Sequence, residues 1–343
     1  MKNRSLLRNL VCAVLVSGCP LLGMPSPSSA TQIAASIEYD FISRPVGLPD
    51  DFQPIAGTSL RFMSITAIDG FKIQAALWEP DAKPPANTTM IVMIHGSGGS
   101  YRRAPESALG PRVAAKGYAA LAIDTRGHDD RVNTENFLDV RRDIDAAVQV
   151  ARALGYKKVV LQGHSLGNIQ VQFYAAINWD RDIQGVVLLG TFGNLPWKTR
   201  TVLMQDEEGF QKLINASLKA LRDGKLDEVL PVKMHYFTGQ DSPVTGQHFL
   251  TYRWDKTSVA DGTFWIRRIP QPILLVRDQS DGLIQPFEPY MLDAAHSEGS
   301  LAASIDFVLL PDSKPASLKG HYFDGNEQSL TDTITTWLAN HNL

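Results

Sequence analysis

Short runs of apolar residues alternate with stretches of helical periodicity along most of this 343-residue chain. A strand that is covered on both faces has apolar side chains on both sides, so continuous apolar runs predict a mostly parallel sheet between helices. We predict strands at 90–94, 118–123, 158–161, 183–189, 272–276 and 305–310. We predict helices at 104–116, 134–154, 166–177, 286–298 and 327–341. The pattern therefore indicates an α/β fold with helices on both faces of the sheet.

An antiparallel edge precedes this region. Residues 60–67 and 71–78 alternate apolar and polar side chains around Asp69-Gly70, which is typical of a tight hairpin. Residues 31–58 are rich in Pro, Gly and Ser, and we expect them to wrap the surface without a regular strand.

The helix predicted at 134–154 has one apolar face. Phe137, Val140 and Ile144 recur at steps of three and four residues, so this face should pack on the sheet. Gly117 and Gly155 should end the first two helices in the left-handed conformation. We expect four charged residues to form the solvated side of the second helix: Arg141, Arg142, Asp143 and Asp145.

The alternation stops between residues 192 and 269, where no buried strand is evident. This segment includes a helical stretch at 207–221. We interpret this segment as a cap inserted into a core formed by residues 31–191 and 270–343. Its aromatic residues should mainly form the core of the cap, although some could line an acyl pocket. Its arginines should mainly be solvated, although one could meet a substrate carboxylate: Arg200, Arg253, Arg267 and Arg268.

The first 30 residues are typical of an export signal. Basic residues at Lys2, Arg4 and Arg8 precede an apolar stretch at 10–16 that is too short to cross a bilayer. Cleavage after Ala30 would leave a periplasmic or secreted protein. The alternative is a lipid anchor at Cys19, which Pro20 disfavours.

Composition narrows the class of partner. Both cysteines, Cys12 and Cys19, lie in the leader, so a chain that starts at Thr31 has no disulfide. The chain has 33 basic and 36 acidic side chains and no basic run, which argues against a nucleic-acid partner. No later segment is apolar over the length of a membrane helix. The sequence does not predict the oligomeric state.

The most informative motif is Gly163-His164-Ser165-Leu166-Gly167, which lies between a predicted strand and a predicted helix. A serine hydroxyl needs exposure, a neighbouring base and amide donors for the oxyanion before it can act as a nucleophile. A sharp turn between strand and helix supplies this context, and flanking glycines permit the turn. Ser165 is therefore the candidate nucleophile.

From about residue 60 onward, the chain resembles the α/β-hydrolase superfamily. Ser165 matches the nucleophile elbow, residues 95–99 (His-Gly-Ser-Gly-Gly) resemble the oxyanion loop, and residues 124–128 resemble the turn after the next strand. The resemblance implies that the backbone N–H groups of Ser97 and Leu166 form the oxyanion hole. It is specific to the superfamily and implies no particular substrate.

The resemblance also places a histidine and an acid after the serine. His321 follows the last predicted strand and would act as the base. Asp281, in the loop after residues 272–276, would orient the histidine, with Asp278 as the alternative. Metal chemistry has little support because the histidines are scattered, and a dinucleotide site lacks the required glycine spacing, so we expect neither a metal nor a cofactor.

These observations predict an exported serine hydrolase that cleaves a small carboxylic ester through an acyl-enzyme. The same triad could instead serve a peptidase, an amidase or an acyltransferase, because it can release an amine or pass the acyl group to another acceptor. A binding protein on a hydrolase scaffold is a further alternative. The presence of all three triad residues argues against it.

Overall fold

The computed structural model describes residues 37–311 and 317–343. The predicted leader, with its cleavage site and Cys19, lies outside these residues. The described residues belong to one compact unit that begins at Ile37.

A nine-stranded sheet organises the described residues, in the order β1-β2-β3-β5-β4-β6-β7-β10-β11. The strands β5, β4, β6, β7, β10 and β11 pair in parallel, whereas β1, β2 and β3 form an antiparallel edge. The strands are β1 Glu38–Ile42, β2 Thr58–Thr66, β3 Lys72–Pro80, β4 Thr89–Ile94, β5 Ala119–Ile123, β6 Lys158–His164, β7 Ile183–Leu189, β10 Ile273–Asp278 and β11 Ile305–Leu310. The α/β fold, with its parallel sheet and antiparallel N-terminal edge, is thus confirmed.

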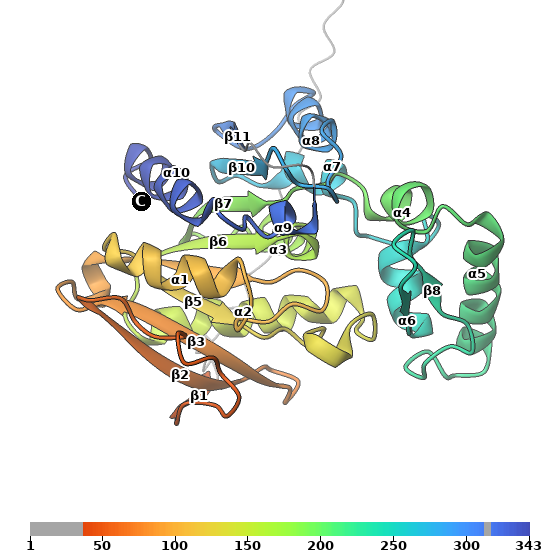
Figure 1. Cartoon of the computed structure of the whole chain (residues 1–343), viewed down its shortest axis with the longest axis horizontal. Coiled ribbons are helices and arrows are strands. Elements are labelled where there is room, and N and C mark those ends of the chain that lie inside the picture. The colour runs from red at the N-terminus through yellow and green to blue at the C-terminus, as the bar shows by residue number, and fades with distance from the viewer. Residues whose placement is uncertain (1–36, 312–316) are drawn as a thin grey trace, which may run out of the picture. The chain divides into compact units, whose positions relative to one another are not determined.

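Alternate residues of each central strand face opposite layers of helices. In β4, Met90, Val92 and Ile94 join an apolar cluster with α2 Phe137–Ala153, α3 Leu166–Asn178 and α8 Glu288–Ser297. Ile91 and Met93 join a second cluster with α1 Glu106–Ala115 and α10 Glu327–Asn340. Because both faces are buried, β4 is apolar throughout, which is why continuous apolar runs predicted the strands correctly. Figure 1 shows these helices on the two sides of the sheet.

Two expectations for the N-terminal half were wrong. Residues 31–58 contain a strand, β1, which pairs with β2 from Glu38↔Thr66 to Ile42↔Phe62. This edge strand is largely exposed, so its sequence lacks the apolar pattern of a buried strand. Asp143 is not solvated but fully buried, and its carboxylate forms an ion pair with Arg126 at 2.7 Å. The left-handed glycines at 117 and 155 are as predicted.

Residues 192–269 contain no strand of the main sheet. Their elements are α4 Leu195–Lys198, a π-helical turn Thr199–Met204, α5 Glu207–Arg222, β8 Met234–His235, β9 Asp241–Ser242, α6 Gly246–His248, a π-helical turn Phe249–Arg253, α7 Gly262–Trp265 and a 3-10 turn Ile266–Arg268. Figure 1 shows α4, α5, α6 and β8 grouped to one side of the sheet. Three further short elements lie outside residues 192–269. They are the 3-10 turns Pro85–Asn87 and Asp129–Arg131 and the helix α9 Leu318–His321.

The segment leaves the core and returns to it at adjacent points. The N–H of Gly262 donates to the Gly193 carbonyl at 2.7 Å, and the N–H of Leu195 donates to the Ala260 carbonyl at 3.1 Å. Between these points, an apolar cluster that includes Met204, Phe210, Leu213 and Phe249 packs within the segment itself. We call residues 195–260 the cap. The following α7 packs against α3 and α8 of the core.

Candidate active site

Ser165 lies at the turn between β6 and α3 with φ 50° and ψ −116°, a conformation that non-glycine residues rarely adopt. Its N–H donates to the Leu189 carbonyl at 2.9 Å, which ties the turn to β7. A Cβ atom on Gly167 would overlap the Ile94 carbonyl oxygen, so only glycine lets α3 approach β4 this closely. The local sequence therefore holds the serine side chain at the carboxyl end of the sheet.

The loop at residues 95–99 lies against this turn. A Cβ atom built on Gly96 would be 2.8 Å from the Cβ atom of Ser165. His95 shapes the loop, because its Nδ1 lies 2.7 Å from the Gly96 carbonyl and its Nε2 accepts from the Thr125 N–H at 3.1 Å. Within the described residues, the N–H groups of Ser97 and Leu166 have no acceptor. Both donors are available to a ligand at Ser165.

His321 lies at the end of α9, and its Nδ1 is 2.9 Å from Oδ2 of Asp281. Both residues are only 2% exposed. The other oxygen of Asp281 accepts from the N–H groups of Leu283 and Ile284 at 2.8 and 2.9 Å. Burial by itself would raise the pKa of Asp281, but His321 and these hydrogen bonds hold it below its usual value. The carboxylate thus fixes the tautomer with the proton on Nδ1.

Asp278, the last residue of β10, is also buried and has different partners. One oxygen accepts from the N–H and the hydroxyl of Ser280, both at 2.8 Å. The other accepts from Nδ2 of Asn326 at 2.8 Å. Its carboxylate therefore shapes the loop, and the geometry brings Asp281, not Asp278, to His321.

His164 contacts both the backbone and the ring of His321. Its Nε2 lies 2.9 Å from the carbonyl oxygen of His321, and the two rings are 4.8 Å apart between centroids. Burial and, to a smaller extent, the nearby His321 lower the pKa of His164 to about 3. A neutral imidazole at this position can donate its Nε2 proton to the His321 carbonyl. No other histidine of the described residues lines the cavities that contain Ser165.

A cavity of about 540 Å³ opens beside these residues. Its wall includes Ser97, Ser165, His321 and Glu106. Glu106 is 1% exposed, and burial raises its pKa to about 8. The sequence did not single out Glu106, because a glutamate in the first turn of a helix is usually a solvated partner of the helix dipole.

A second cavity, of about 530 Å³, extends under the cap and shares Ser97, Ser165 and Leu283 with the first. Apolar side chains from both core and cap line it: Val132, Leu166, Phe192, Leu195, Leu203, Phe237, Ile284 and Leu318. Tyr236 and Phe237 are the cap aromatic residues in this wall, whereas Phe210 and Tyr252 are buried in apolar clusters. The serine therefore faces a mainly apolar space.

A buried ion pair joins the cap to the loop that carries Asp281. Nζ of Lys198, in α4, lies 2.6 Å from Oε2 of Glu288 and donates to the Leu283 carbonyl at 2.9 Å. Neither side chain is more than 2% exposed. Sequence reasoning missed this pair because its members lie in different elements without a shared motif.

The arginines of the inserted segment differ in environment. Arg200 is exposed and pairs with Glu207, and Arg267 is partly exposed and pairs with Glu298. Arg253 departs from the expectation of solvated charge, since it is 2% exposed and lines the second cavity.

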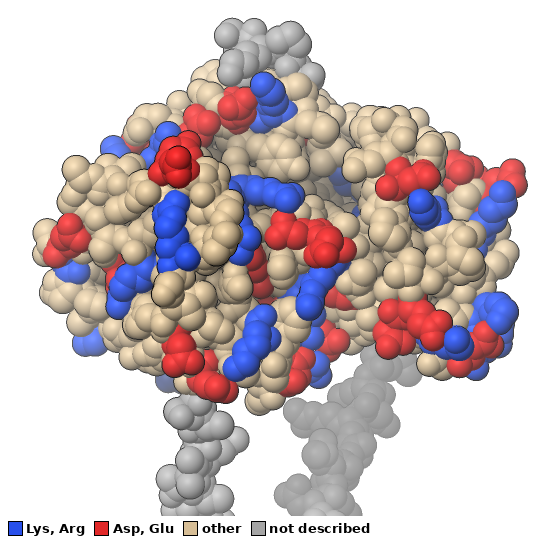
Figure 2. Space-filling model, turned by 60° about the horizontal axis from the view of Figure 1, so that its bottom comes forward, with Lys and Arg blue, Asp and Glu red and all other residues tan. Residues whose placement is uncertain are grey.

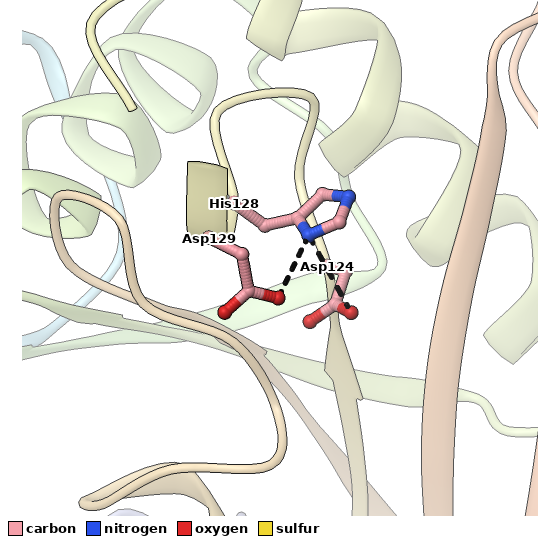
Figure 3. Close-up of side chains that lie close together, drawn as sticks. All are labelled: Asp124, His128 and Asp129. Atoms are coloured by element: carbon pink, nitrogen blue, oxygen red, sulfur yellow. Dashed lines mark hydrogen bonds and ion pairs between the residues drawn. The ribbon is translucent and has the colours of Figure 1, made fainter. Parts of the chain in front are cut away.

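Asp124, His128 and Asp129 lie together after β5, with potential ligand atoms within 4.8 Å of one another. Figure 3 shows Nδ1 of His128 facing both carboxylates. Asp124 already accepts from the Tyr101 N–H at 2.9 Å, and Asp129 pairs with Arg103 at 2.8 Å. These contacts hold the loop together, and we assign no metal to it.

Charge on the surface is mixed. Figure 2 shows acidic and basic side chains interspersed over the face that it draws. No helix in the described part of the chain combines the length and hydropathy needed to cross a bilayer.

Several solved structures are similar to this chain. Est1E from Butyrivibrio proteoclasticus, with ferulic acid bound, is 20% identical with a TM-score of 0.58, over 80% of this chain and 98% of that one. The esterase domain of a Rhodothermus marinus protein is 17% identical with a TM-score of 0.54, over 82% and 98%. An acetyl xylan esterase from Paenibacillus sp. R4 is 16% identical with a TM-score of 0.55, over 88% of each chain. No curated protein matches the sequence.

The family model described as alpha/beta hydrolase fold matches residues 89–307, from the start of β4 into β11. This match spans most of the chain and includes the serine turn and the Asp281 loop. The chain therefore belongs to the α/β-hydrolase fold family.

Proposed function

We propose that this protein is a serine hydrolase that cleaves carboxylic esters through an acyl-enzyme. The observation that carries the proposal is the buried Asp281–His321 pair, whose histidine lines the same cavity as Ser165. A base with a fixed tautomer, beside a serine held at a strained turn, is the arrangement that nucleophilic catalysis requires.

In the proposed reaction, Oγ of Ser165 attacks the ester carbonyl while Nε2 of His321 takes the hydroxyl proton. The oxyanion of the tetrahedral intermediate accepts from the N–H groups of Ser97 and Leu166. The position of Leu166 at the start of α3 adds the positive end of the helix dipole. His321 then returns its proton to the leaving alcohol, and Ser165 keeps the acyl group.

Water completes the cycle. His321 takes a proton from the attacking water, a second tetrahedral intermediate forms at the same oxyanion site, and the serine leaves with the proton from His321. The products are an alcohol and a carboxylic acid. Asp281 remains ionised throughout and stabilises the imidazolium, in accordance with its lowered pKa.

Two observations favour an ester. The cavity wall under the cap is mainly apolar, which suits an acyl chain. Two of the similar structures described above carry the word esterase in their names. We also propose export to the periplasm or the medium, on the basis of residues 1–30 alone.

The test is hydrolysis of 4-nitrophenyl esters of increasing acyl length by protein that starts at Thr31, with Ser165→Ala in parallel. The proposal predicts turnover that depends on chain length and is lost in the variant. A folded wild-type protein that hydrolyses none of these esters would contradict it.

A further inference from the structure

Arg253 is a buried cation of the cap with neutral partners. Its Nε donates to Nε2 of His248 at 3.2 Å, and its two terminal nitrogens donate to Oγ1 of Thr199 at 3.3 Å and Oδ1 of Asn133 at 3.0 Å. Among the ion pairs of residues 37–311 and 317–343, none includes Arg253. A guanidinium has five N–H bonds, so two of them have no acceptor within the described residues.

The acid beside His248, Glu135, forms no ion pair with Arg253 within the described residues. Because the guanidinium always donates, Nε2 of His248 must accept, and the proton of this imidazole lies on Nδ1. That Nδ1 lies 3.4 Å from Oε2 of Glu135. Burial also lowers the pKa of His248 in spite of the nearby Glu135, which favours the neutral ring. A neutral imidazole therefore separates Arg253 from the carboxylate of Glu135.

Arg253 faces the cavity that contains Ser165, and it supplies the excess positive charge of that cavity. The other two cations in the wall are paired: Arg103 with Asp129 at 2.8 Å and Lys198 with Glu288 at 2.6 Å. A buried charge without a counterion is costly in proteins because its lost hydration is not replaced, and a ligand of opposite charge would replace it.

We propose that Arg253 forms a subsite for a carboxylate group of the substrate, so that the preferred esters carry a free carboxylate beyond an apolar spacer. The planar guanidinium matches a carboxylate in geometry. One unpaired positive charge matches one negative charge, whereas a phosphate carries nearly two at neutral pH. The apolar wall formed by Phe192, Leu195 and Phe237 would cover the spacer. The substrate class rests on the proposed esterase function, whereas the carboxylate subsite does not.

The kinetic test compares two ester series with equal chain lengths. Mono-4-nitrophenyl esters of adipate, pimelate, suberate and sebacate have a terminal carboxylate, and the matching carbamoyl compounds have a neutral amide of similar size. At the best length, we expect kcat/KM of the wild-type protein to favour the carboxylate by roughly ten- to hundred-fold, mainly through KM. Equal kcat/KM for both series at every length would overturn the proposal, without the need for any variant.

Substitutions locate the effect. Arg253→Gln and the more apolar Arg253→Met should each reduce the carboxylate-to-carbamoyl ratio of kcat/KM toward one. Arg200→Gln is the matched control, since Arg200 is exposed in the same cap and pairs with Glu207. It should keep the wild-type ratio. An Arg253 variant that lowers kcat/KM for both esters by the same factor would show a purely structural role and overturn the proposal.

Calorimetry with the Ser165→Ala protein separates the two proposals. Suberate should bind more tightly than suberamide, and Arg253→Gln in the same background should remove the difference. Suberate binding without ester turnover by the wild-type protein would contradict the esterase function and leave the subsite in place. Equal affinity for suberate and suberamide, or tighter binding of inorganic phosphate than of suberate, would overturn the carboxylate assignment.

Discussion

Nδ1 of His321 lies 2.9 Å from Oδ2 of Asp281, while Asp278, at the end of β10, accepts from Ser280 and Asn326. The two aspartates therefore have separable roles. We predict that Asp281→Asn lowers kcat about ten-thousand-fold, because the amide would favour the wrong imidazole tautomer. Steady-state kinetics on a 4-nitrophenyl ester measure this.

Asp278→Asn is the matched control. It should reduce the melting temperature, because the buried loop loses charged hydrogen bonds, while kcat of the folded fraction stays within about ten-fold of the wild-type value. A wild-type kcat in Asp281→Asn, together with the loss of turnover in folded Asp278→Asn, would reverse the assignment.

Glu106 should make stability depend on pH. Its pKa is raised from 4.5 to about 8 in the folded protein. Between these values the folded state binds a proton that the unfolded state has lost, so this group stabilises fully below pH 4.5 and loses its contribution as pH rises through 8. The glutamine of Glu106→Gln does not ionise, so this variant should not lose stability in this way as the pH rises.

The measurement is urea unfolding of both proteins at several pH values. The stability of Glu106→Gln relative to wild type should rise by about 2 kcal/mol or more between the acidic and the alkaline end. A difference that is independent of pH would contradict the buried, protonated carboxyl.

The ion pair between Lys198 and Glu288 should contribute to stability as a unit. Both groups are buried, so Lys198→Met leaves an unpaired carboxyl and Glu288→Gln leaves an unpaired ammonium. Each single substitution should lower the free energy of unfolding by about 3–5 kcal/mol. The double variant should lose much less than the sum, because neither charge is then left alone.

A double-mutant cycle from denaturant unfolding gives the coupling energy. Arg200→Met and Glu207→Gln form the exposed control pair and should show much weaker coupling, because water screens both charges. Additive effects at Lys198 and Glu288 would mean that the pair does not link α4 to the loop before α8.

The sequence predicted the features that neighbouring residues determine. The central strands β4, β5, β6, β7 and β10 are mainly apolar because both sheet faces are buried there, and the turn at Ser165 needs glycines within two residues of it. The order of Ser165, Asp281 and His321 along the chain also agrees with the elements that carry them, since each lies in a turn, loop or short helix at the carboxyl end of the sheet.

Other features depend on contacts between distant segments and could not be read locally. Asp143 belongs to a helix that carries several charged residues, and its burial beside Arg126, a residue 17 positions earlier, is not evident from the sequence around it. Arg253 donates to Asn133 and Thr199 from two distant parts of the chain, so a count of charges in the cap could not distinguish it from Arg200. Both side chains were expected to be solvated, and both are buried.

The central claim is that Ser165 becomes acylated. The most direct measurement is mass spectrometry of the protein during turnover of a 4-nitrophenyl ester and after reaction with a fluorophosphonate probe, followed by peptide mapping. We predict the acyl or phosphonyl mass on the peptide that contains Ser165, and neither adduct nor turnover in folded Ser165→Ala. An adduct on another residue, or undiminished ester turnover by Ser165→Ala, would contradict the account.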